Sequence, residues 1–225
     1  MGHSSCPTAL VVTAVLCGVV FVAQAQTPPK SKTTHAGKPS DKQEEDTQLY
    51  RNTTVGFRYQ IPFGWVDRTK EINSTDASGT PSAGAMKNPN EKDAGKAAVL
   101  LAVFERPPEA TGDTVNSAVV IASESAASYP GLKKAEDYLG SLSELVTAKG
   151  FKSDGEPYAL EVESRHLIRA DFTKTLSESL AMRQCTLVLL AKGQIVSFTF
   201  IASSEDEIDN LMESLHFDVR KSSTN

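Results

Sequence analysis

The stretch VGFRYQIPFGW, Val55–Trp65, marks the start of a folded domain and decides its fold class. Four of its residues are aromatic, and it holds the only tryptophan of the 225-residue chain. Apolar and polar side chains alternate from Phe57 to Ile61, which is typical of a strand with one buried face. Pro62 ends this strand, and Gly64 permits a turn that brings Trp65 back to the sheet. We expect Trp65 to be a core aromatic; the alternative is a ligand-stacking role.

A long polar stretch, Asp67–Lys96, follows the first strand. It is rich in Gly, Ser, Asn and Pro, and loops of this length inside compact domains are either functional or disordered. We predict a disordered loop here. The stretch contains Asn73-Ser74-Thr75, and Asn52-Thr53-Thr54 lies upstream; both fit the N-glycosylation pattern, which matters only in a eukaryotic secretory pathway.

The rest of the domain alternates runs of strands with single helices. The helix that ends at Gly150 has apolar residues at spacings of three and four, and Ser204 with Glu207 forms a capping box for a final helix. Lys192-Gly193 predicts a tight hairpin. Separated helices and consecutive strands favour an α+β fold with an antiparallel sheet. The predicted strands are Ala97–Phe104, Ala118–Ala122, Tyr158–Val162, His166–Thr173, Met182–Ala191 and Ile195–Ala202.

The N-terminus has the pattern of an export signal. Ala9–Val22 is almost wholly apolar, and its 14 or so residues fall short of the roughly 20 that span a bilayer. Ala23-Gln24-Ala25 places small residues where signal peptidase cuts, so we expect cleavage between Ala25 and Gln26 and a periplasmic or secreted protein. The first eight residues lack Lys and Arg, and an uncleaved anchor is the alternative. Cys17 follows a leucine, which argues against a lipidated cysteine.

Residues 26–48 are rich in Pro, Ser, Thr and Lys and show no hydrophobic periodicity. They predict a flexible tether before a single domain at 49–218, with a short tail at 219–225. Cleavage would remove Cys6 and Cys17, leaving Cys185 as the only cysteine. An intramolecular disulfide would then be impossible despite an oxidising compartment.

Composition excludes several classes of function. The net charge of −5 disfavours binding to nucleic acid. The chain has no glycine fingerprint for nucleotides, no HExxH, CxxC or GxSxG motif, and no cluster of metal-ligating residues. We therefore expect no cofactor and no metal.

A resemblance appears in the dipeptides GF at 56–57, IP at 61–62 and GW at 64–65, together with the hydrophobic hairpin and final amphipathic helix. The region 49–217 resembles the PsbP, DcrB and Mog-type Ran-binding families. The resemblance implies an α/β/α sandwich around a mostly antiparallel sheet. It also implies a non-catalytic accessory or binding protein, and it carries over no catalytic residue.

One predicted hairpin carries the candidate site residues. With its turn centred on Glu178, Cys185 shares a face with Arg169, Asp171 and Arg183, whereas His166 points to the other face. This arrangement disfavours a Cys-His pair, and a buried, inert thiol is the expected state of Cys185. A one-residue shift in register would reverse this conclusion.

Two interpretations of the charged face remain open. Arg169, Asp171 and Arg183 form either an ordinary ion-pair ladder on the surface or a two-arginine site for an anion or a partner's carboxylate. The sequence thus predicts an exported binding protein of the cell envelope, partnered by another envelope or secreted protein. The alternative is a hydrolase-like enzyme that uses Cys185 or an acidic pair.

Overall fold

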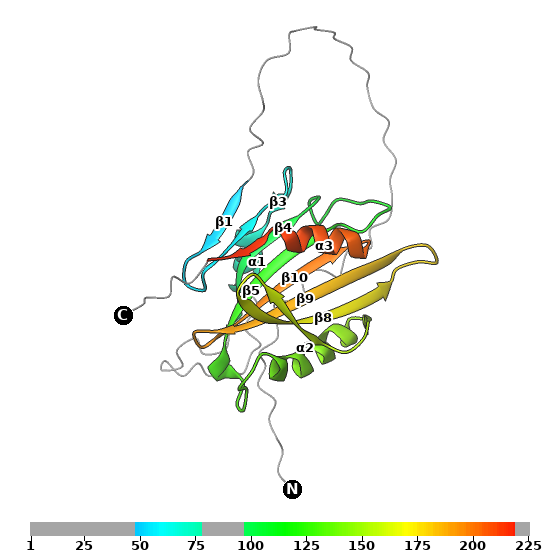
Figure 1. The fold of residues 1–225 in the computed structure, drawn as a ribbon. Helices are drawn as coiled ribbons and strands as arrows, with labels where there is room; N and C mark the ends of the chain where they lie inside the picture. The colour runs from blue at the N-terminus through cyan, green and yellow to red at the C-terminus, as the bar shows by residue number, and fades with distance from the viewer. Residues whose placement is uncertain (1–47, 78–96, 219–225) are drawn as a thin grey trace, which may run out of the picture.

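A computed structural model describes residues 48–77 and 97–218 (Figure 1). The predicted signal segment, the tether apart from Gln48, the tail and residues 78–96 of the predicted loop lie outside these ranges. Among the described residues, the helices are all too short or too polar to cross a membrane. The predicted α+β class is confirmed, because the described chain is mostly antiparallel strand with a few helices.

The strands form two antiparallel sheets. The small sheet has the order β1-β2-β11, and the large sheet has the order β3-β4-β5-β10-β9-β8-β6, with β7 also paired to β8. The strands are β1 Leu49–Asn52, β2 Phe57–Gln60, β3 Val66–Asp67, β4 Ala98–Phe104, β5 Ala118–Ser125, β6 Lys152–Ser153, β7 Tyr158–Val162, β8 Arg165–Thr175, β9 Ala181–Ala191, β10 Gln194–Ala202 and β11 Leu215–Phe217. The helices are α1 Thr69–Ala77, the 3-10 turn Ala126–Ser128, α2 Glu136–Ala148 and α3 Glu205–Glu213.

Alternation along the central strands divides the core between the two faces of the large sheet. Phe198 of β10 packs with α3 and the small sheet. Ile195, three residues earlier in the same strand and therefore on the opposite face, packs with α2. Ile201 has the parity of Ile195 and packs with Ile72 of α1. One face of the large sheet is therefore covered by α1 and α2, and the other by α3 and the small sheet (Figure 1).

The predicted strands and both predicted helices are present, with ends shifted by a few residues at most. Lys192 and Gly193 both have positive φ, at 52° and 74°, as a tight two-residue hairpin requires. Ser204 caps α3 by accepting a hydrogen bond from the Glu207 backbone N–H at 3.2 Å. The Glu207 carboxylate reaches back to the N–H of Ser203 rather than to that of Ser204.

The predicted loop at 67–96 is wrong in its first part. Asp67 belongs to β3, and Thr69–Ala77 form α1, which packs on the edge of β4. The Asn73 side chain donates to the carbonyl of Val99 at 2.9 Å and accepts from its N–H at 3.3 Å, and the Ala102 N–H donates to Thr69 Oγ1 at 2.9 Å. These tertiary hydrogen bonds hold a helix whose own composition does not favour one.

Trp65 lies half-buried just before β3 and packs against the edge of the main core cluster. Phe63, two residues earlier, is 72% exposed. The turn at Gly64, where φ is 80°, thus separates an outward aromatic from an inward one.

Candidate binding pocket beside helix α3

The register of the β8–β9 hairpin sets the faces of the candidate residues. Asp171 pairs with Cys185, and Arg183 pairs with Thr173, so the turn is centred on Glu178 as predicted. Arg169, Asp171, Arg183 and Cys185 share the face of the sheet that α3 covers.

The outer edge of β8 is shared by two short strands, and the segment between them builds one wall of a pocket. β7 pairs with β8 up to Arg169, and β6 pairs with it from Phe172. Between them the Asp154 N–H donates to the carbonyl of Asp171 at 2.8 Å. The Asp154 and Tyr158 side chains thereby stand beside the charged face.

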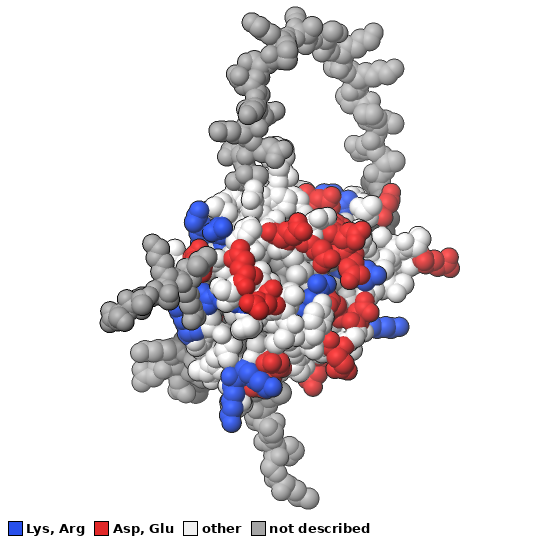
Figure 2. Space-filling view, in the orientation of Figure 1, with Lys and Arg blue, Asp and Glu red and all other residues white. Residues whose placement is uncertain are grey.

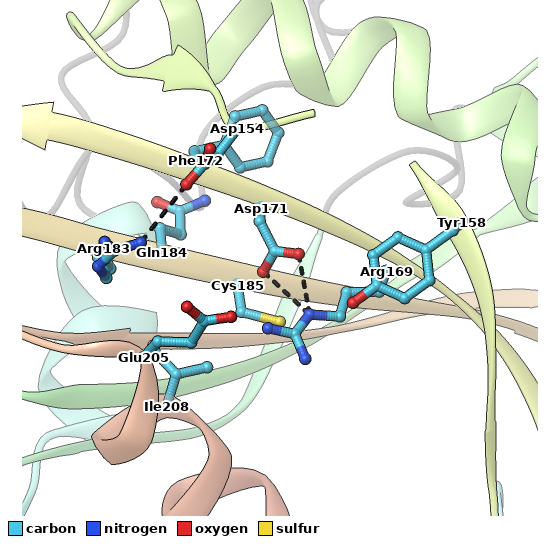
Figure 3. Close-up of a pocket in the computed structure, with 10 residues that line it drawn as sticks. All are labelled: Asp154, Tyr158, Arg169, Asp171, Phe172, Arg183, Gln184, Cys185, Glu205 and Ile208. Carbon is cyan, nitrogen blue, oxygen red and sulfur yellow. Dashed lines mark hydrogen bonds and ion pairs between the residues drawn. The ribbon is translucent and has the colours of Figure 1, made fainter. Parts of the chain in front are cut away.

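Helix α3 supplies the opposite wall. Its first turn places Glu205 and Ile208 against the strands, as Figure 3 shows. The resulting pocket has a volume of about 310 Å³. Its lining residues are Asp154, Tyr158, Arg169, Asp171, Phe172, Arg183, Gln184, Cys185, Glu205 and Ile208.

Both arginines of the pocket already have carboxylate partners. Arg169 Nε donates to the two Asp171 oxygens at 3.0 and 2.9 Å, and its Nη1 lies 3.5 Å from Asp209 Oδ1. Arg183 Nη1 lies 3.4 Å from Asp154 Oδ2. The Arg169 guanidinium also lies over the Tyr158 ring, 5.9 Å from its centroid. The pocket therefore presents ion pairs rather than two unpaired cations.

The thiol of Cys185 lies at the floor of the pocket and is 1% exposed. Burial raises its pKa well above the usual range, and the negative charge of Asp171 adds to this effect. Its Sγ donates a hydrogen bond to the sulfur of Met212 at 3.7 Å. His166 has the parity of the opposite face of β8, so it cannot serve Cys185 as a base. These features are those of an inert thiol.

We expect iodoacetamide to leave Cys185 unmodified in the folded protein at mildly alkaline pH. Alkylation should be slower than in guanidinium chloride by a factor on the order of 100 or more, because the thiolate forms only after local unfolding. Mass mapping of peptides separates Cys185 from Cys6 and Cys17. Rapid alkylation of Cys185 in the folded state would contradict an inert thiol.

Acidic side chains surround the pocket. Figure 2 shows Asp and Glu gathered over the region where Figure 1 draws α3. Helix α3 carries the sequence EDEIDNLME and has no basic residue in its last turn. The face around the pocket is therefore negative, even though two arginines lie within it.

The structure brings together Arg169, Asp171 and Arg183, but Trp65 is not among the residues that line the pocket. Asp154, Tyr158 and Glu205 were not singled out from the sequence. Within the two described ranges, groups of three or more His, Cys, Asp or Glu that could hold a metal ion are absent.

Searches among protein-family models and curated proteins found no match to this chain. Solved structures with a similar chain path include the cyanobacterial PsbP (CyanoP) of Synechocystis sp. PCC 6803. It shows 13% identity and a TM-score of 0.46, and the match covers 81% of this chain and 98% of that one.

Two further similar structures come from other organisms. The Ran-binding protein Mog1p of Saccharomyces cerevisiae shows 8% identity and a TM-score of 0.40 over 77% of this chain and 96% of that one. LpqN of Mycobacterium tuberculosis, involved in cell envelope biogenesis, shows 10% identity and a TM-score of 0.33 over 76% and 81%. PsbP and the Mog-type Ran-binding proteins, which the sequence resembles, are thus both represented among the similar structures.

Proposed function

We propose that this chain is an exported, non-catalytic accessory or binding protein of the cell envelope, periplasmic or secreted. The pocket beside α3 is its binding site, and another protein of the same compartment is its partner. The N-terminal signal pattern supports export. The fold in this proposal is an α/β/α sandwich of the PsbP/Mog type, carried on a tether formed by residues 26–48 after cleavage between Ala25 and Gln26.

The observation that carries the proposal is the pairing of charges within the pocket. The enzyme alternative needs an activated thiol at Cys185 or a pair of carboxylates that are both free to exchange protons. Here Asp171 is held by Arg169, and the thiol of Cys185 is protonated and buried. Paired charges at the bottom of an open hollow instead offer fixed donors and acceptors to an incoming surface.

Arg169, Asp171 and Arg183 are the proposed binding residues. Arg169 and Asp171 are the least exposed ion pair here, with side-chain exposures of 11% and 24%, so they fix the shape of the floor. Arg183 is 40% exposed and is the one placed to exchange its carboxylate partner. Trp65 does not line the pocket, and we propose it as a further binding residue elsewhere on the surface.

The double variant Arg183→Ala/Asp154→Ala is expected to lose up to about fivefold in capture of the partner from an envelope fraction, because an exposed ion pair contributes up to about 1 kcal/mol. Quantitative mass spectrometry of proteins retained by the immobilised chain measures this loss. The matched control is Arg58→Ala/Asp218→Ala, an ion pair with nearly equal exposure, 39% and 54% against 40% and 57%.

The control variant should retain the partner at the level of the unaltered chain. Equal retention by both variants would exclude the pocket as the binding site. Thermal unfolding of both variants checks that their stabilities match, since neither pair is buried.

A further inference from the structure

The sign of the charge left over in the pocket indicates which ligand it can take. Five charged residues line the pocket, and four of them form the pairs Arg169–Asp171 and Arg183–Asp154. The fifth is Glu205, whose carboxylate makes no hydrogen bond or ion pair with any residue that the structure describes. One negative charge thus remains after the internal pairs are counted.

The position of Glu205 suits an acceptor role. It is in the first turn of α3, held at the pocket wall because the Ser204 cap fixes the start of the helix. Figure 3 draws its side chain rising from α3 towards the strands. Asp209 lies one turn further along α3, and its Oδ1 is 3.5 Å from Arg169 Nη1. Its carboxylate makes the electrostatic potential around the pocket more negative.

The opposite wall supplies an aromatic surface. Tyr158 is 48% exposed, and its ring already carries the Arg169 guanidinium at 5.9 Å. Tyr158 remains exposed beyond this contact, and an exposed aromatic surface can cover the apolar stem of a cationic group.

Resting on the function proposed above, we propose that the pocket binds a guanidinium or ammonium group carried on an apolar stem, with Glu205 as its acceptor and Tyr158 beside its stem. A basic side chain of a partner protein has this chemistry, and so does a small organic cation. A free anion would have to displace Asp171 or Asp154 from its arginine in a field that is already negative.

The probes are three blocked peptides, acetyl-Gly-Arg-Gly-amide, acetyl-Gly-Glu-Gly-amide and acetyl-Gly-Gln-Gly-amide, titrated against the purified chain by NMR. The arginine peptide is expected to bind most tightly, to shift the amide signals of pocket residues and to weaken as salt rises. Glu205→Gln should weaken its binding by about two- to fivefold, the range that loss of one partly exposed ion pair produces.

Asp206→Asn is the matched control. It removes the same charge from the same turn of α3, but Asp206 does not line the pocket. It should change binding of the arginine peptide by less than the Glu205 variant does. Equal effects of the two variants would overturn the proposal, because binding would then be a general attraction to the negative surface. Tighter binding of the glutamate peptide would overturn it as well, because the pocket would then prefer an anion.

Blocked arginine alone, acetyl-arginine-amide, separates the two sources of the cation. Binding as tight as that of the tripeptide indicates a small ligand, and weaker binding indicates a segment of a partner protein. If none of the probes binds while partner capture still depends on Arg183 and Asp154, the cation proposal is wrong and the binding function stands. If capture fails as well, the pocket is not a binding site.

Discussion

Raising the pH from 9 to 11 is expected to lower the free energy of unfolding by about 5 kcal/mol. Three buried groups carry this effect: Cys185, Tyr59 and Tyr138. Burial raises the pKa of each well above its usual range, and the carboxylate of Glu124 adds to the shift at Tyr138. The Tyr59 hydroxyl donates to the carbonyl of Leu211 at 3.2 Å.

The direction of the effect follows from which state loses its protons first. In the unfolded chain the thiol ionises near pH 9 and the tyrosines near pH 10. In the folded chain all three stay protonated across this range, because their folded-state pKa values are raised. The unfolded state therefore binds fewer protons, and stability that is complete below pH 9 is lost as the pH rises. Each fully ionised group costs about 1.4 kcal/mol per pH unit.

Urea denaturation at a series of pH values measures this slope. Tyr138→Phe removes one titrating group and should lower the loss between pH 9 and pH 11 by about a quarter, although it lowers stability at neutral pH by leaving Glu124 with one partner fewer. A free energy of unfolding that stays constant over this interval would show that these groups are accessible to solvent in the folded state.

The charged face could be predicted because a hairpin is a local structure. Once the turn is placed at Glu178, the pairing of Asp171 with Cys185 follows from the symmetry of an antiparallel ladder, and the period of two fixes the faces. The start of α3 was equally local, since Ser204 and Glu207 lie three residues apart. These features needed no knowledge of the rest of the fold.

The other walls of the pocket could not be predicted, because they depend on contacts between distant segments. Asp154 and Tyr158 meet the site only because β6 and β7 share the edge of β8, and Glu205 meets it only because α3 crosses that face. Helix α1 was missed for the same reason. Its Asn73 satisfies backbone groups of β4, and side-chain hydrogen bonds of this kind leave no periodic signal in the sequence.

The junction between the two sheets depends on three aromatic rings, and the largest single-residue loss of stability is expected there. Phe198 of β10 is fully buried and meets Phe57 of β2 edge-on at 5.0 Å and Phe217 of β11 at 5.9 Å, between ring centroids. Phe57 and Phe217 also meet each other, at 6.4 Å. β10 belongs to the large sheet, whereas β2 and β11 belong to the small sheet, so this cluster joins the two sheets.

Phe198→Ala is expected to lower the free energy of unfolding by about 3–5 kcal/mol, because it removes a buried ring and leaves a cavity between sheets that cannot close over it. The loss includes two edge-to-face pairs, each contributing about 0.5–1.5 kcal/mol beyond burial. This is a large part of the roughly 5–15 kcal/mol that stabilises a typical domain. Urea denaturation of the variant beside the unaltered chain measures it.

Phe63→Ala makes the same chemical change where the ring is 72% exposed, and its effect should stay within about 0.5 kcal/mol. The contrast between the two variants separates burial from ring size. If Phe198→Ala costs under about 1 kcal/mol, the sheets must repack around the missing ring. The small sheet would then be loosely attached, and because α3 packs in the same cluster, the wall that carries Glu205 would be free to move as well.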